Sequence, residues 1–240
     1  MTTSFPRKAF RVGIICGSQR KPRVGDQITN FVLETVQLHS SSASTSEKHN
    51  ISFDFDYIDI SALDMPFYDE PGIPSKTTPS EGYVHEHTRK WSRRVASLDA
   101  FIFVTPQYNW GIPAGLKNAI DFLYHEWKGK PAIIISYGGH GGDKAAAALK
   151  MCLVGGIGMQ SGDKMIVNLS FPSRDSLYAA AQGHHLGLDA SKEGGIWSSE
   201  RKCITKAWDE MVDMLVSKGV AKAAVQVSQM FTHLKMALQK

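Results

Sequence analysis

The chain has 240 residues, of which 42% are hydrophobic and 21% are charged. These are the values of a globular protein, so intrinsically disordered and fibrous classes are excluded. The formal net charge is only +4, and the basic residues are scattered apart from Arg20, Lys21 and Arg23. Composition therefore gives no argument for a nucleic-acid partner or for an anionic membrane surface.

The cysteines and the apolar runs indicate the compartment. Cys16, Cys152 and Cys203 lie far apart and form no CxxC pair, which is typical of reduced thiols in an intracellular protein. Residues 1–10 lack the apolar core of a secretory signal. No apolar run approaches the roughly 20 residues that cross a bilayer. We expect a cytoplasmic protein without membrane contact.

Apolar runs of strand length alternate along the chain with stretches of helical period. Strands are expected at residues 11–16, 51–60, 100–105, 132–136 and 164–169. Helices are expected at residues 28–35, 84–98, 113–123, 143–154 and 204–215. Five strand–helix units in series predict an α/β fold with a parallel sheet and helices on both faces. Ligands of such sheets bind beyond the carboxyl ends of the strands.

The connection at residues 61–82 is unusually long and contains four prolines, Pro66, Pro71, Pro74 and Pro79. Connections of more than about 12–15 residues often carry function, and a plain surface loop is the alternative interpretation.

The segment between the first strand and the first helix, residues 17–25 (GSQRKPRVG), suits a monophosphate. A helix N-terminus offers free backbone N–H groups and about half a positive charge. Ser18 adds a hydroxyl, and Arg20 and Arg23 add guanidinium groups. The pattern is neither GxGxxG nor a P-loop, so a dinucleotide or a nucleoside triphosphate fits poorly. A basic surface turn is the alternative.

Aromatic and amide side chains follow the third strand, within TPQYNWGIP at residues 105–113. Tyr108 and Trp110 offer ring faces, and the amides of Gln107 and Asn109 offer hydrogen bonds to the edge of a heterocycle. Aromatic residues that only close a helix terminus are the alternative interpretation.

A glycine-rich turn, SYGGHGG at residues 136–142, follows the fourth strand and presents backbone N–H groups that stabilise negative charge on a ligand. Together the three loops supply a phosphate-binding segment (residues 17–25), aromatic rings (residues 105–113) and a glycine-rich turn with free backbone amides (residues 136–142) along one edge of the sheet. That combination matches flavin mononucleotide (FMN) better than any other common cofactor.

These motifs resemble those of the NAD(P)H-dependent FMN reductase family, which includes azoreductases, quinone reductases and chromate-reducing flavoproteins. The resemblance covers roughly residues 10–215, and its most specific part is PQYNWGIPAGLKNAID, which begins at Pro106. It implies a flavodoxin-like fold, with a five-stranded parallel sheet in the order 2-1-3-4-5. It also implies a homodimer or homotetramer, with the helix at residues 116–123 near the subunit contact.

The resemblance further implies three groups of FMN-binding residues. They are Ser18, Arg20, Arg23, Val24 and Gly25 at the phosphate, Pro106, Gln107, Tyr108, Asn109 and Trp110 along the isoalloxazine ring, and Ser136, Tyr137, Gly138 and Gly139 on its pyrimidine side. Gln107 departs from the family, which usually has glutamate there.

The expected function is that of an FMN-dependent NAD(P)H oxidoreductase. NAD(P)H is the co-substrate, and a hydride passes through flavin N5 to a small-molecule acceptor such as a quinone, an azo compound or free flavin. We expect no catalytic side chain and no metal, because the flavin carries the chemistry. Two alternatives are a flavin-bearing redox-sensing partner protein and a binding module that has lost flavin.

We expect one FMN-binding domain at residues 8–218 and an amphipathic helical tail at residues 219–240. The tail keeps a 3.5-residue apolar spacing, and packs on its own domain or on a neighbouring subunit. His85, Glu86 and His87 resemble a metal chelate, but without HExxH spacing we expect a solvated helix start. Cys16 and Cys152 are expected to be buried packing residues.

Overall fold

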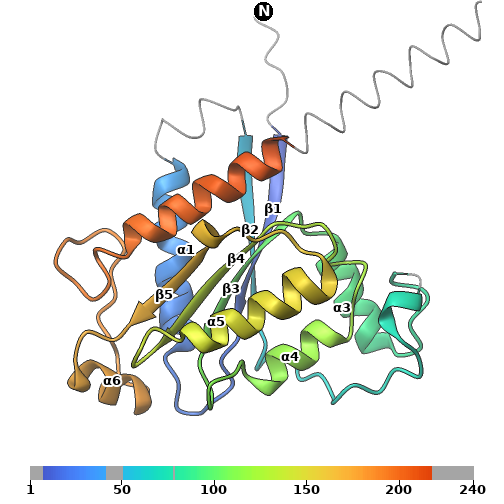
Figure 1. Cartoon of the computed structure of the whole chain (residues 1–240), viewed down its shortest axis with the longest axis horizontal. Coiled ribbons are helices and arrows are strands. Elements are labelled where there is room, and N and C mark those ends of the chain that lie inside the picture. Colours follow the sequence, from blue (N-terminus) through green and yellow to red (C-terminus); the bar gives the residue numbers. More distant parts are fainter. Residues whose placement is uncertain (1–7, 42–50, 78, 218–240) are drawn as a thin grey trace, which may run out of the picture.

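The computed structural model describes residues 8–41, 51–77 and 79–217. Its centre is a five-stranded parallel sheet in the order β2-β1-β3-β4-β5 (Figure 1). The strands are β1 (Lys8–Cys16), β2 (Ile51–Asp59), β3 (Ala100–Pro106), β4 (Ala132–Gly138) and β5 (Ile166–Ser170). The flavodoxin-like fold and the strand order that the resemblance implies are both confirmed.

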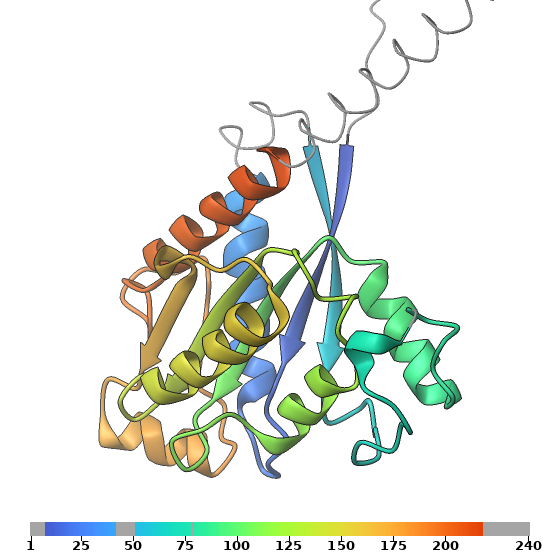
Figure 2. The same ribbon diagram turned by 45° about the vertical axis from the view of Figure 1, so that its right-hand side comes forward.

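Helices cover both faces of this sheet (Figure 2). The α-helices are α1 (Gly25–Ser41), α3 (Glu86–Ala96), α4 (Ala114–Asp121), α5 (Asp143–Lys150), α6 (Arg174–Ala181) and a last helix at residues 201–217. Three shorter segments are η1 (Pro74–Lys76), η2 (Met151–Ile157) and η3 (Asp163–Met165). Every residue of β3 is buried, as expected for a strand covered on both sides.

Alternate residues of the strands supply two separate cores. Val12 and Ile14 of β1 belong to the core that α1 and the last helix close, which contains Phe31 and Trp208. Ile15 belongs to the opposite core, which α3, α4 and α5 close. The period-2 alternation of a strand thus fixes which helices cover which face.

The structure corrects three details of the sequence prediction. Val84 lies before α3 and is 58% exposed, because the Glu70 carboxylate accepts the amides of Val84 and His85 and fixes the connection ahead of the helix. The fourth predicted helix is α5 followed by η2, a π-helical segment. Cys152 lies in that segment and is half-buried rather than buried, whereas Cys16 is buried as expected.

The expected tail at residues 219–240 lies outside the described residues. Within the described part of the chain, no helix is long and apolar enough to cross a membrane. That same part contains no group of three or more His, Cys, Asp or Glu side chains arranged to hold a metal ion.

Candidate functional site

A cavity of about 240 Å³ lies at the carboxyl ends of β1, β3 and β4. The loops that follow these three strands line it, as sequence reasoning predicted. A fourth wall comes from the segment after β5. The lining residues are Ser18, Arg20, Pro22, Arg23, Val24, Pro106, Gln107, Tyr108, Tyr137, Gly138, Gly139, Phe171, Leu177, Ala180 and Ala181.

The β1–α1 loop brings a buried hydroxyl and a helix N-terminus to the cavity. Ser18 is 3% exposed and lies at its edge. The first helical hydrogen bond of α1 runs from the Ile28 amide to the Val24 carbonyl. The backbone amides that precede Ile28 in the first turn therefore have no acceptor within the helix. Gly25 packs closely here, since a Cβ on it would lie 2.6 Å from Ser18 Cβ. The local chemistry is that of an anion site.

Arg23 fastens this loop to the end of β2. Its Nη1 donates to the Ser18 carbonyl at 2.6 Å and to Asp59 Oδ1 at 3.0 Å, and its Nη2 donates to Asp59 Oδ2 at 2.5 Å. The hydrogen-bonded guanidinium lowers the pKa of Asp59, and the carboxylate in turn raises the pKa of Arg23. Arg23 therefore shapes the loop, and Asp59 already balances its charge.

Arg20 is the arginine whose charge remains available. Among the residues that the structure describes, no carboxylate forms an ion pair with it, and its guanidinium carbon lies 3.9 Å from the centroid of the Tyr108 ring. The Tyr108 hydroxyl lies 3.0 Å from Ser18 Oγ and accepts the Arg20 amide at 3.3 Å. The Tyr108 hydroxyl thus contacts Ser18 Oγ and the Arg20 amide, which are the donors that a bound anion would use.

A two-residue hairpin turn presents Tyr108 to the cavity. The amides and carbonyls of Tyr108 and Gly111 exchange hydrogen bonds of 2.9 Å around Asn109 and Trp110, which both have positive φ, 48° and 66°. Left-handed conformations of non-glycine residues cost of order 1–3 kcal/mol and cluster at functional sites. Trp110 is 73% exposed, and neither it nor Asn109 lines the cavity.

Gln107 lines the cavity and also caps the start of α5. Its Oε1 accepts the Lys144 amide at 3.2 Å and the Ala145 amide at 3.3 Å, so the side chain caps that helix. A neutral amide caps a helix N-terminus with its oxygen and keeps the amide nitrogen as a donor. The glutamine at this position is therefore compatible with the fold.

The β4 loop divides into lining and supporting residues. Tyr137, Gly138 and Gly139 line the cavity, and burial raises the pKa of Tyr137. Ser136 is fully buried, and its Oγ lies 2.7 Å from both the Gly141 carbonyl oxygen and Asn168 Oδ1, one of which accepts its single proton. Ser136 therefore supports the turn from beneath, and Gly25 supports the β1 loop in the same way.

The wall after β5 was not predicted residue by residue. Phe171, Leu177, Ala180 and Ala181 belong to it, and Pro22 is the other lining residue that no motif indicated. The stretch at residues 170–199 matches no motif, and the only signal there was its position after the last strand.

The predicted metal-like triplet is a helix start outside the cavity. His85 is the N-cap of α3 and Glu86 begins the helix. The imidazole Nε2 of His87 lies 3.1 Å from Asp69 Oδ1, and the His85 and His87 rings stack with centroids 5.2 Å apart. The interpretation as a helix start agrees with this arrangement.

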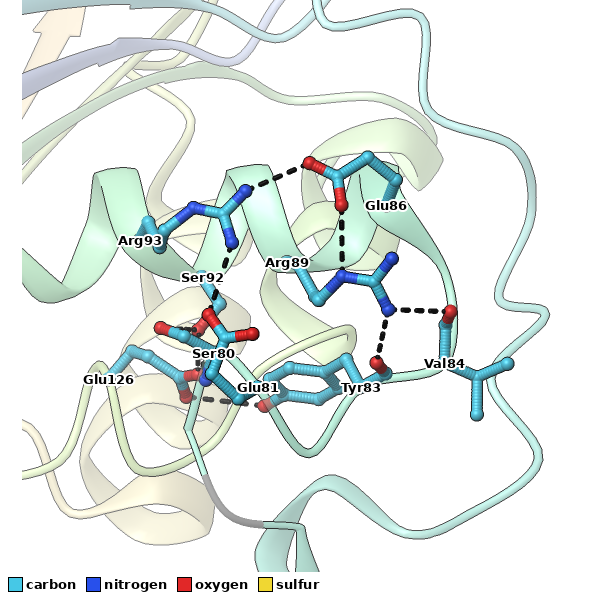
Figure 3. Close-up of polar contacts among 9 residues, drawn as sticks. All are labelled: Ser80, Glu81, Tyr83, Val84, Glu86, Arg89, Ser92, Arg93 and Glu126. Atoms are coloured by element: carbon cyan, nitrogen blue, oxygen red, sulfur yellow. Dashed lines mark hydrogen bonds and ion pairs between the residues drawn. The ribbon is translucent and has the colours of Figure 1, made fainter.

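A buried polar cluster holds the neighbouring connection against α3 (Figure 3). The Glu126 side chain is 3% exposed and accepts hydrogen bonds from Ser92 Oγ at 2.5 Å and Tyr83 Oη at 3.3 Å. Ser92 Oγ accepts the Ser80 amide at 2.9 Å, and Arg93 pairs with Glu81 at the surface. None of these residues lines the cavity, so the cluster supports the fold rather than the site.

Comparison with known proteins matches residues 10–171 to the family model of NADPH-dependent FMN reductases. The chain belongs to this family. Its expected enzyme class, an NAD(P)H-dependent FMN reductase-type oxidoreductase, is confirmed.

Curated relatives agree with that assignment, and a solved structure agrees with the fold. The chain is 43% identical over 160 residues to the NAD(P)H-dependent FMN reductase LOT6 of Saccharomyces cerevisiae, covering 63% of this chain and 81% of the relative. It is 34% identical over 207 residues to the NAD(P)H-dependent FMN reductase ntnL of Nectria sp, covering 85% and 96%. The flavoenzyme NAD(P)H:(acceptor) oxidoreductase FerB of Paracoccus denitrificans shares the fold, with a TM-score of 0.54 and 23% identity over 86% of this chain and 97% of that one.

The donor set of the cavity fits FMN. Ser18, Arg20 and the N-terminus of α1 would hold the phosphate. Gly138 leaves its backbone open, since a Cβ on it would meet nothing nearer than 3.7 Å. Such a cradle accepts the flat edge of a heterocycle, and the Tyr108 and Pro106 side chains lie beside it.

Proposed function

We propose that this protein binds FMN in the cavity and uses it to reduce small-molecule electrophiles with NAD(P)H. The acceptors are quinones, azo compounds or free flavin. The observation that carries the proposal is the convergence on one cavity of a buried hydroxyl, a helix N-terminus, two glycines and Arg20, which pairs with no carboxylate of the described residues.

In this proposal the flavin carries the redox chemistry, and the protein binds and orients the flavin. Bound FMN would supply the hydride carrier at N5, so that NAD(P)H, a proton and a quinone give NAD(P)⁺ and a hydroquinone. Arg20 and Ser18 bind the phosphate end, Arg23 with Asp59 keeps the Ser18 carbonyl in place, and the backbone amides at Gly138 and Gly139 stabilise negative charge on the ring. No side-chain acid or base is required.

The assembly is a homodimer or homotetramer in this proposal. Support comes from the connection at residues 61–85, which holds large exposed apolar side chains close to α4. Phe67 is 84% exposed and Ile73 is 66% exposed. The Asn118 amide of α4 donates to the Pro66 carbonyl at 2.7 Å, which fixes the connection against the helix expected at the subunit contact.

The proposed phosphate-binding role of the β1–α1 loop is tested by replacing Arg20. Arg20→Ala should weaken FMN binding by about 1.5–3 kcal/mol, the scale of a hydrogen bond to a charged group, which is roughly 10- to 150-fold in the dissociation constant. Lys21→Ala is the matched control, because Lys21 is exposed and does not line the cavity. Quenching of FMN fluorescence reports both affinities. Equal affinities of the two variants would remove Arg20 from the site.

A further inference from the structure

The helix α6 is the part of the cavity that the family model does not include. The model ends at residue 171, and α6 begins at Arg174. The helix lies beyond the end of β5, beside the loops at the carboxyl edge of the sheet (Figure 1). Its inner side supplies Leu177, Ala180 and Ala181 to the cavity, next to Phe171. This wall is entirely apolar.

The start of α6 is capped, and the chain beyond its end is fixed to the β1–α1 loop and to α1. At its start, Ser173 and Ser176 form a capping box. Beyond its end, Gly183 adopts φ +70° and packs so closely on the β1–α1 loop that a Cβ there would lie 2.6 Å from Pro22 Cβ. The Gln27 side chain of α1 also donates to the His184 carbonyl at 3.1 Å and accepts the Leu186 amide at 2.9 Å. The helix is therefore a fixed wall.

Leu177 occupies the end of the wall next to the glycine cradle. A Cβ built on Gly139 would lie 3.3 Å from Leu177 Cδ2, so the leucine lies directly over that glycine. The charged residues of α6, Arg174 and Asp175, are exposed and do not line the cavity. The Arg20 guanidinium stands on the β1–α1 loop instead, next to the Arg23–Asp59 ion pair. The two ends of the cavity thus differ in polarity.

We propose that α6 selects the electron acceptor, and that Leu177 is the residue that determines this specificity. The wall favours a flat, uncharged aromatic ring such as a naphthoquinone. It disfavours the same ring with a negative charge, because an ionised group placed against Ala180, Ala181 and Leu177, which is 39% exposed, loses part of its hydration without gaining a partner. This inference rests on the proposed function and names the acceptor class of the same site.

The test compares two acceptors that differ by one charge, 2-methyl-1,4-naphthoquinone and 1,4-naphthoquinone-2-sulfonate. The wild-type chain should have the higher kcat/KM for the uncharged quinone. Leu177→Lys should lower the ratio of the two kcat/KM values about tenfold or more, as expected for a changed contact in an apolar pocket. Tyr178→Lys adds the same charge one residue along α6, where the side chain is 71% exposed and outside the cavity, and should leave the ratio unchanged.

A binding measurement accompanies the kinetics. The redox-inactive pair 2-naphthol and 2-naphthalenesulfonate is titrated into the FMN-loaded proteins, and changes in flavin absorbance report binding. Leu177→Lys should shift this preference toward the sulfonate, and Tyr178→Lys should not. An unchanged ratio in Leu177→Lys, or weaker FMN binding without a changed ratio, overturns the role of α6. Failure of the wild-type chain to bind FMN overturns the proposed function instead, and the inference with it.

Discussion

Gly25 is the position where the smallest possible change should damage the site most. A Cβ there would lie 2.6 Å from Ser18 Cβ, 2.9 Å from the Tyr137 hydroxyl and 3.3 Å from Cys16 Sγ. Ser18, Tyr137 and Cys16 are all buried, so none of these side chains can turn into solvent to make room for the added methyl group. Overpacking of this kind costs about 1–3 kcal/mol. We expect Gly25→Ala to lower the free energy of unfolding by that amount.

The same substitution should also weaken FMN binding, by roughly tenfold or more, because Ser18 and Tyr137 line the cavity. Urea unfolding measures the stability, and quenching of FMN fluorescence measures the affinity. Gly162→Ala is the matched control, since a Cβ there meets nothing within 4 Å and its φ is −78°. If Gly25→Ala matched Gly162→Ala in both measurements, the tight packing around the phosphate loop would be refuted.

Three further substitutions test the supporting structure by urea unfolding. Asp59→Asn should cost about 1–3 kcal/mol at neutral pH; because the pKa of Asp59 is lowered in the folded state, the difference from wild type should shrink as the pH falls below about 4. Burial lowers the pKa of Lys130 to about 8, so the folded chain releases this proton before the unfolded chain does. Wild-type stability should therefore rise relative to Lys130→Met between about pH 8 and 10, by about 1 kcal/mol after allowance for solvent screening, and a flat difference would contradict this. Glu126→Ala removes the acceptor of the buried Ser92 and Tyr83 hydroxyls and should cost about 1–3 kcal/mol. Glu81→Ala, at a side chain that is 79% exposed, should cost under about 0.5 kcal/mol, and equal losses would refute the buried cluster.

The sheet and the three cavity loops were predictable because they depend on local periodicity and on one rule of topology. The buried run at residues 100–106 identifies a central strand, and the carboxyl ends of parallel strands meet at one edge. Ser18, Tyr108 and Gly139 follow three different strands and meet in one cavity for that reason.

The remaining features depend on contacts between residues far apart in the chain. Sequence reasoning placed Arg23 at the phosphate but could not foresee its ion pair with Asp59, 36 residues away, which holds it in the cavity wall. Ser136 was expected to end the fourth strand and contact the ligand, yet β4 continues to Gly138 and the Ser136 hydroxyl contacts Asn168 of the neighbouring strand. Leu177 reaches the cavity because Gly183 packs on Pro22, a contact that no local pattern indicates.

The most direct test of the central claim is an FMN titration of the full chain. Saturable quenching of flavin fluorescence at one FMN per chain is expected, and anaerobic NADH or NADPH should then bleach the visible absorbance of the bound flavin. Quinone added afterwards should restore that absorbance. A chain that shows no quenching, or that keeps its flavin colour with both nicotinamides, would contradict the account.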